Sequence, residues 1–236
     1  MKTKTIDIHQ RNAALISGIS IVIMTLAAIV ATDLTIGKLF VADDAVETWK
    51  NIVKSKSLFR LGIISWLLVL VADVFAAWGL YIFFKPVNKN LSLLMAWFRL
   101  VYVAILGASL MNLIYVLPMI SGADNFSSFG VVQLQLQSFF YSNAFYDFWA
   151  FGLIVFGLHI LFLGWLVLKS GFRINILGML LILAFFGYTV TNGSNLFFPQ
   201  YENIMYYVGL IFFIPMISEV ALGIWLLFIG LKNKTK

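Results

Sequence analysis

Four ionisable side chains lie inside long apolar runs of the sequence: Asp73, Arg99, His159 and Glu219. If the runs are helices, each side chain lies about 8 to 11 residues from the same end, at a depth of roughly 12–17 Å. A charged side chain that faces lipid costs roughly 2.5–3.5 kcal/mol, so we expect these groups to face inward and to contact one another. Arg99 would bridge the two carboxylates, leaving one unpaired negative charge that a protonated His159 would cancel. The cluster therefore predicts a buried site for a ligand or a proton.

Three further residues are expected to have secondary roles at this site. Tyr102 and Ser109 extend the Arg99 face of their helix outward. Pro215 has no N–H with which to bond the carbonyl of Ile211, so it predicts a kink one turn before Glu219. A carbonyl left unpaired there would suit a water molecule or a cation.

Most other chemistry is excluded by what the sequence lacks. Without cysteine there is no disulfide, thiolate metal site or cysteine nucleophile. The motifs of zinc proteases, serine hydrolases, phosphate-binding loops and dinucleotide-binding folds are missing. A single intramembrane histidine cannot supply a three-histidine zinc site, and His9 lies outside the runs, which disfavours a haem held by two histidines. We therefore predict no catalytic residue, no metal and no cofactor.

The elements that position the cluster are read from hydropathy. The chain of 236 residues is 62% hydrophobic and 11% charged, and its mean hydropathy is +0.98, which excludes an ordinary soluble domain. About 30 Å of hydrocarbon requires roughly 20 apolar residues in a helix. The sequence predicts one all-α integral membrane domain over residues 1–236, with six transmembrane helices at about 13–32, 61–84, 91–120, 144–168, 174–197 and 205–230.

The distribution of Lys and Arg predicts the orientation of the bundle. Ten of the sixteen fall on the side that holds both termini: Lys2, Lys4, Arg11, Lys85, Lys89, Lys169, Arg173, Lys232, Lys234 and Lys236. Five of the others lie in one loop on the opposite side, and the loop 121–143 contains none. Both termini are therefore predicted to be cytoplasmic. The positive net charge of +6 is then a topology signal, and no basic stripe with interleaved aromatic residues indicates nucleic-acid binding.

The first outer loop, residues 33–60, is predicted to contain one amphipathic helix. Apolar residues recur at helical spacing from Ala42 to Val53, and Asp43 or Asp44 is suited to cap the start. This helix would lie on the outer leaflet, or it would act as a lid over an outward-facing cavity. Tyrosines concentrated near the same boundary, including Tyr146, fit an interfacial belt, with a ligand-binding aromatic cage as the alternative.

Several motifs together resemble a known family. They are Phe59-Arg60-Leu61-Gly62, Leu80-Tyr81 before Lys85-Pro86-Val87-Asn88-Lys89, Phe98-Arg99, Phe156-Gly157-Leu158-His159, Lys169-Ser170-Gly171 before Ile176-Leu177-Gly178, and Glu219 before Trp225. Nearly the whole chain is similar to bacterial multi-pass membrane proteins grouped as domain of unknown function 4386. One departure is Arg173-Ile174-Asn175, where the family pattern has a proline. The resemblance implies a bacterial plasma (inner) membrane and about this number of helices, and it implies no activity.

Three functions remain open. The first is a small carrier, or a membrane protein that binds a solute, a lipid or a proton, with the buried cluster as its site. The second is a structural or accessory membrane subunit in which the charges only lock helix packing. The third is a lipid-modifying membrane enzyme with Glu219 or His159 as general base, although the missing motifs favour a protein that is not an enzyme. Besides the lipid bilayer, no partner and no oligomeric state is predicted.

Overall fold

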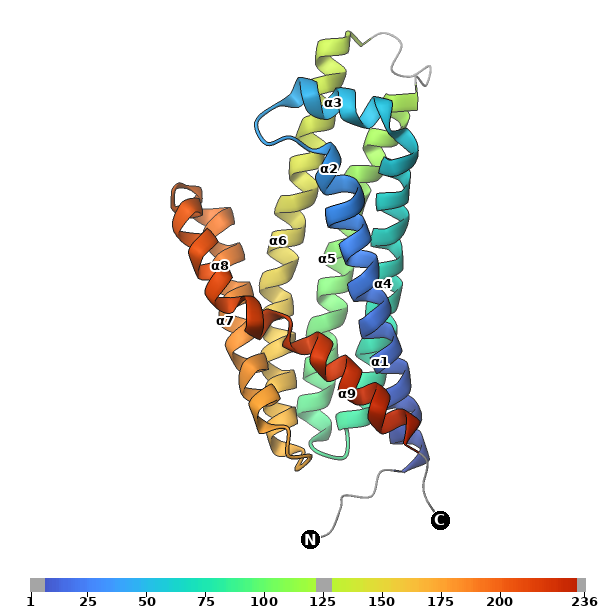
Figure 1. Cartoon of the computed structure of the whole chain (residues 1–236), viewed down its shortest axis with the longest axis vertical. Coiled ribbons are helices and arrows are strands. Elements are labelled where there is room, and N and C mark those ends of the chain that lie inside the picture. The colour runs from blue at the N-terminus through green and yellow to red at the C-terminus, as the bar shows by residue number, and fades with distance from the viewer. Residues whose placement is uncertain (1–6, 122–128, 233–236) are drawn as a thin grey trace. The chain divides into compact units, whose positions relative to one another are not determined.

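The structure is a computed structural model that describes residues 7–121 and 129–232. These residues form helices and no strand (Figure 1). In chain order the elements are α1 Ile8–Ile29, the π-helix η1 Val30–Ile36, α2 Gly37–Leu39, α3 Ala45–Lys54, α4 Lys56–Phe84, α5 Lys89–Ser121, α6 Val131–Lys169, α7 Asn175–Phe197, the 3-10 helix η3 Pro199–Tyr201, α8 Glu202–Met216 and α9 Ser218–Leu231. Lys2, Lys4, Lys234 and Lys236, which enter the orientation prediction, lie outside the described residues, as does part of the loop 121–143.

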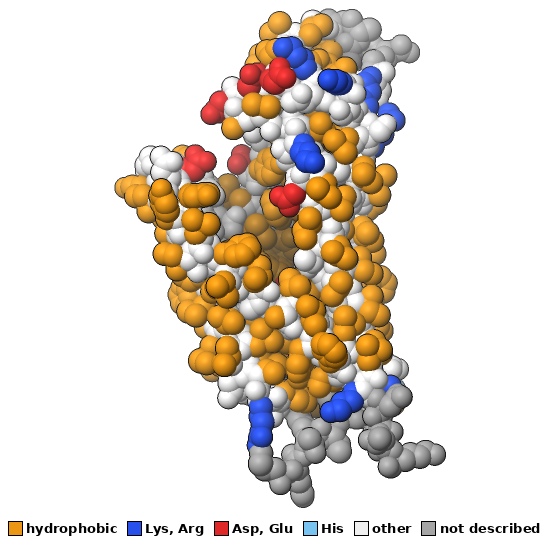
Figure 2. Space-filling view, viewed as in Figure 1, with side chains coloured by type: hydrophobic (Ala, Val, Ile, Leu, Met, Phe, Trp, Pro, Cys, Tyr) orange, Lys and Arg blue, Asp and Glu red, His pale blue; other side chains and the backbone are white. Residues whose placement is uncertain are grey.

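Six stretches of helix are long and apolar enough to cross a membrane, which confirms the predicted fold class. They are Ile8–Leu39, Lys56–Phe84, Lys89–Ser121, Val131–Lys169, Asn175–Phe197 and Pro199–Leu231. Their outer faces carry large apolar side chains, such as Ile176, Ile211 and Phe228, that are 70–74% exposed. Figure 2 shows such side chains covering α7 and α8. Because water would make these faces aggregate, their solvent is lipid, and the chain is a multi-pass membrane protein. The cytoplasmic placement of the termini stays a prediction.

The first and fourth spans extend furthest beyond the predicted ranges. The first continues beyond 32 because Thr35 donates to the carbonyls of Val30 and Ala31, so a polar residue is accommodated inside the helix. The fourth begins at Val131 instead of 144. Its early polar residues, Ser138 and Ser142, are buried, and their hydroxyls donate to Met119 Sδ at 3.6 Å and to the Ser138 carbonyl at 2.7 Å. Polar residues that suggested a loop are thus satisfied within helical structure.

The sixth span is interrupted. Helix α8 contains Pro215 and ends at Met216, and α9 begins at Ser218 in a different direction (Figure 1). Ile217 lies between them, and its carbonyl accepts a short-range bond from the Val220 N–H at 3.1 Å. The kink predicted from Pro215 is therefore a break in the helix, and it lies next to Glu219.

Contacts divide the chain into two compact units. Unit 1 contains the chain up to Ile23, Val71–Ala104 and the chain from Ala150 onward, and unit 2 contains Met24–Leu70 and Ile105–Trp149. A single membrane domain over residues 1–236 stays a prediction.

Unit 1 is packed through glycines. A Cβ atom added at Gly18 of α1 would lie 2.7 Å from the backbone oxygen of Gly223 in α9, so these helices pack backbone to backbone. Gly164 of α6 makes the same kind of approach to the backbone oxygen of Gly178 in α7, at 2.8 Å. Beside them, α7 and α8 form a hairpin (Figure 1). These close approaches fix α9 against α1 and α6 against α7. Helices α6 and α9 each carry one residue of the candidate site described below.

Unit 2 has an aromatic core. Trp66 of α4 is 1% exposed, and its ring lies 5.3 Å from that of Phe145 and 4.8 Å from that of Trp149, both on α6. The loop helix α3 also belongs to this unit. The Asp44 carboxylate caps it by accepting from the Glu47 N–H at 2.8 Å, which pairs one of the unsatisfied donors of its first turn. Whether α3 rests on a leaflet or acts as a lid stays a prediction.

Candidate functional site

The four predicted side chains meet inside unit 1. Asp73 lies on α4, Arg99 on α5, His159 on α6 and Glu219 in the first turn of α9. Their exposed fractions are 2%, 0%, 0% and 4%, respectively. A single cluster therefore joins four of the six spans, and a guanidinium group lies at its centre.

Arg99 contacts the other three members directly. Its Nε donates to Asp73 Oδ1 at 2.8 Å, and its Nη2 lies 2.6 Å from the same oxygen. Its Nη1 donates to Glu219 Oε1 and also lies 2.9 Å from His159 Nε2. The guanidinium carbon lies 5.4 Å from the centre of the Phe156 ring, a cation–π distance. Because charge-assisted hydrogen bonds are the strong ones, Arg99 holds α4, α6 and α9 to α5.

The hydrogen bonds of His159 define its protonation state in this arrangement. A guanidinium group only donates, so His159 Nε2 must accept from Arg99. The proton is then on Nδ1, which donates to the backbone carbonyl of Met95 at 3.0 Å. His159 is neutral here, and the four groups together carry one negative charge. His159 Nε2 also lies 3.9 Å from Glu219 Oε1. If Nε2 were protonated, a small rotation of the ring would let it donate to that oxygen.

The break in the sixth span places Glu219 in this cluster. Because α9 begins at Ser218, the Glu219 carboxylate lies in the first turn, where the unpaired N–H groups and the helix dipole favour a negative charge. The Ser218 hydroxyl is buried beside it and has no hydrogen-bond partner among the described residues. On the other side of the break, the Tyr188 hydroxyl reaches the Met216 carbonyl at 3.4 Å.

The three secondary residues differ in their placement. Tyr102 is buried in unit 1, and its ring lies 4.9 Å from that of Phe156. Pro215 immediately precedes the break. Ser109 belongs to unit 2, where it donates to the Phe145 carbonyl at 2.6 Å, so its bond serves the packing of α5 on α6.

Sequence reasoning missed two aromatic residues at the site. Phe156 contacts Arg99, and its ring lies 5.3 Å from those of His159 and Tyr188. Its position three residues before His159 was the available signal, because residues at that spacing share a helix face. Tyr188 gave a weaker signal, as one hydroxyl within an apolar run.

The chemistry open to this cluster is proton exchange and charge pairing. Within the described ranges no three His, Cys, Asp or Glu side chains are grouped so as to hold a metal ion. Each carboxylate already accepts from the guanidinium, and an arginine at the centre of a site repels a cation. The neutral His159 ring contacts the Arg99 guanidinium and lies close to the Glu219 carboxylate. Protonation of this ring would therefore rearrange both neighbours.

Comparison with known proteins identifies the family but no activity. The model of the family described as domain of unknown function DUF4386 matches residues 16–230, nearly the whole chain. The chain belongs to this family. A relative described as an uncharacterized protein comes from Archaeoglobus fulgidus and is 34% identical over 123 residues. The match covers 52% of this chain and 60% of the relative, so the chain spans less than two thirds of that protein's length. No solved structure matches.

Proposed function

We propose that this protein is a carrier that couples a proton to the movement of a small solute across a bacterial plasma membrane. The observation that supports this proposal is the neutral His159 ring, which accepts from Arg99 while Glu219 lies 3.9 Å away. Ionisable groups inside a membrane bundle are characteristic of ion and proton pathways.

Protonation of His159 would rearrange the cluster. A proton on Nε2 removes the lone pair that accepts from Arg99 and places two cations next to each other. The ring would then pair with Glu219, and the summed charge of the four groups would change from −1 to zero. One proton therefore changes both the charge of the cluster and one of the contacts that join α5 to α6.

The interrupted sixth span provides the element that would move. Broken helices near the membrane midplane line the binding sites of many secondary transporters, because chain breaks there expose backbone groups and absorb changes in direction. Here the break lies between Pro215 and Glu219, so a change in the cluster acts directly on the start of α9. The unpartnered hydroxyl of Ser218 offers a solute a hydrogen bond at the same place.

One observation favours a second candidate, a structural subunit. All four members of the cluster are at most 4% exposed, as expected of a clamp that only fixes helix packing. The two functions differ in what a solute and a pH gradient do, so transport separates them.

The test is uptake of a panel of radiolabelled amines, organic acids and sugars into proteoliposomes, with and without an inward proton gradient. The deciding variant is His159→Gln, because a glutamine amide accepts from Arg99 but takes up no proton. We expect wild-type protein to accumulate at least one solute only with the gradient, and His159→Gln to lose this dependence while its melting temperature stays near that of the wild type.

The matched control is His9→Gln, since His9 lies in the first turn of α1, is exposed, and is absent from the contacts of the cluster. Gradient-driven uptake by His159→Gln equal to that of the wild type would refute the proton role. If no solute in the panel is taken up, and variants of the cluster change only the stability of the protein, the carrier proposal is refuted and the protein is a structural subunit.

A further inference from the structure

A cavity of about 260 Å³ lies in unit 2, separate from the charged cluster. One wall is the chain from Gly37 to Ala42, and the other is a face of α6. The cavity is somewhat smaller than the roughly 300–1,000 Å³ of sites for drug-sized ligands, so its size fits a small organic molecule or a headgroup.

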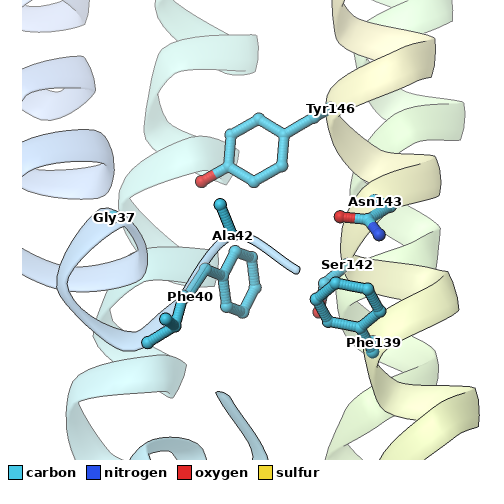
Figure 3. Close-up of a pocket in the computed structure, with 8 residues that line it drawn as sticks. Gly37, Phe40, Ala42, Phe139, Ser142, Asn143 and Tyr146 are labelled. Atoms are coloured by element: carbon cyan, nitrogen blue, oxygen red, sulfur yellow. The ribbon is translucent and has the colours of Figure 1, made fainter. Parts of the chain in front are cut away.

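Three aromatic rings line this cavity. Figure 3 shows Phe40 on the loop wall and Phe139 on the α6 wall, with Tyr146 above them. The Phe40 and Tyr146 rings make an edge contact, with centroids 5.8 Å apart. Rings presented from two sides are how proteins recognise ammonium groups, because the face of each ring is electrostatically negative.

The loop wall is held in place by α3. The Thr48 hydroxyl, on a side chain 1% exposed, accepts from the Val41 N–H at 2.9 Å and lies 3.2 Å from the Val41 carbonyl oxygen. The chain then turns at Asp43, whose φ of 59° is unusual for a residue other than glycine. The position of Phe40 is thus set by contacts made elsewhere, which reduces the cost of ordering the wall when a ligand binds.

The α6 face beside the cavity carries three polar groups without a hydrogen-bond partner among the described residues, whereas the Ser142 hydroxyl donates to the Ser138 carbonyl. Phe139, Asn143 and Tyr146 fall at helical spacing, and Asp147 continues the same face one turn beyond Asn143. Within residues 7–121 and 129–232, the Asn143 amide, the Tyr146 hydroxyl and the Asp147 carboxylate make no hydrogen bond or ion pair. The Asn143 amide and the Tyr146 hydroxyl therefore line the cavity without a partner among the described residues, and the Asp147 carboxylate lies one helical turn beyond Asn143, outside the lining.

Acidic residues outnumber basic ones in the two segments that line the cavity. Asp33, Asp43, Asp44 and Asp147 lie within four residues of lining residues, whereas Lys38 is the one base that does. Lys38 follows Gly37, so it is turned about 100° from that lining position. Asp44 caps α3 and Asp33 accepts from the Thr32 hydroxyl, which leaves the carboxylates of Asp43 and Asp147 against one ammonium group. This balance favours a cationic ligand over an anionic one.

We propose that this cavity binds an organic ammonium group, held between the Phe40, Phe139 and Tyr146 rings and balanced by Asp147. The site is independent of the proposed carrier function, because no member of the charged cluster lines it. The ammonium group belongs either to a small cation in solution or to a lipid headgroup, and both sources present the same chemistry to the rings.

The test compares choline with dimethylbutanol, its uncharged carbon isostere, by calorimetry on the full-length protein in a non-ionic detergent. We expect saturable binding of choline at least about tenfold tighter than that of the isostere, since cation–π attraction and a nearby carboxylate act only on the charge. Equal affinities, or no binding of choline, would overturn the proposal.

Variants locate the site. Phe139→Leu and Asp147→Asn are each expected to weaken choline binding about three- to tenfold. The matched control is Phe140→Leu, since Phe140 is 69% exposed and does not line the cavity, and its affinity should equal that of the wild type. If Phe140→Leu weakens binding as much as Phe139→Leu, or if neither does, choline binds elsewhere and the assignment is wrong.

Lipid discs separate the two sources of the ammonium group. In discs of phosphatidylglycerol, which has no ammonium group, choline should bind as it does in detergent. If phosphatidylcholine discs abolish that binding, the headgroup occupies the site; if they leave it unchanged, the ligand is a cation in solution. Loss of choline binding in phosphatidylglycerol discs would contradict the proposal, whether the ammonium group belongs to a lipid headgroup or to a cation in solution.

Discussion

Replacing Arg99 with methionine tests whether one guanidinium group stabilises the cluster. The side chain is 0% exposed and contacts two carboxylates and an imidazole. Arg99→Met keeps a long unbranched side chain but removes every donor and the only cation of the four groups. With His159 neutral, the charge of the cluster then changes from −1 to −2.

The expected loss is large because both carboxylates stay buried. Removing one partner of a buried ion pair costs about 3–5 kcal/mol, since the other charge is left uncompensated. Arg99 serves Asp73 at 2% exposure and Glu219 at 4%, so we expect a value near the upper end, about 4–5 kcal/mol. A triple variant with Asp73→Leu and Glu219→Met added should recover more than half of this loss, because it removes the charges that Arg99 compensated.

The assay is reversible unfolding in mixed micelles, with the free energy of unfolding measured for wild type, Arg99→Met and the triple variant. A variant with Asp73→Leu and Glu219→Met but with Arg99 retained completes the thermodynamic cycle. It gives the coupling free energy between Arg99 and the two carboxylates. A loss below about 1 kcal/mol for Arg99→Met, or a triple variant no more stable than the single one, would refute the view that Arg99 compensates both carboxylates.

Three further outcomes are expected. Gly18→Ala should cost about 1–3 kcal/mol of unfolding free energy, because its Cβ atom would lie 2.7 Å from a backbone oxygen of α9, whereas Gly209→Ala, with no atom within 4 Å of its Cβ, should cost nothing; equal losses would contradict the close packing. In a His9→Gln protein, ¹⁵N NMR of His159, then the single histidine, should show a neutral ring protonated at Nδ1; a proton on Nε2 would contradict its contact with Arg99. Asp44→Ala should remove about 1 kcal/mol from α3, seen as roughly fivefold faster amide exchange in its first turn, and unchanged exchange would show that the cap is unimportant.

Much of the fold follows from the sequence because a helix that crosses lipid must present about 20 consecutive apolar residues. Apolar runs near 20 residues predicted six spans, and the described part of the chain contains six. The rule is weaker at helix ends, where polar side chains suggest loops. At Thr35 and Ser142 the helices extend past the predicted bounds, because a hydroxyl that bonds a carbonyl of its own helix adds little cost.

The sequence predicted the members of the candidate cluster and the bridge from Arg99 to both carboxylates, but not the contact between His159 and Arg99. An ionisable residue inside an apolar run stands out, so Asp73, Arg99, His159 and Glu219 were found without a structure. Which nitrogen of His159 accepts, and that it accepts from Arg99, depends on the rotation of α5 against α6. Sequence periodicity does not specify that rotation precisely enough to place two side-chain atoms within hydrogen-bonding distance.

The sequence suggested a cavity or aromatic cage near Tyr146 only as an alternative, and it did not indicate the walls of the cavity in unit 2. Its loop wall depends on the bond between Thr48 and Val41 and on a left-handed residue at Asp43, for which the sequence has no clear pattern. The sequence by itself determined the solvent, the spans and the set of charges that had to be hidden from lipid, because each follows from the free energy of transferring a side chain. Only the tertiary structure decided how His159 contacts Arg99 and where a cavity remains, because both depend on distances of a few ångströms between segments far apart in the chain.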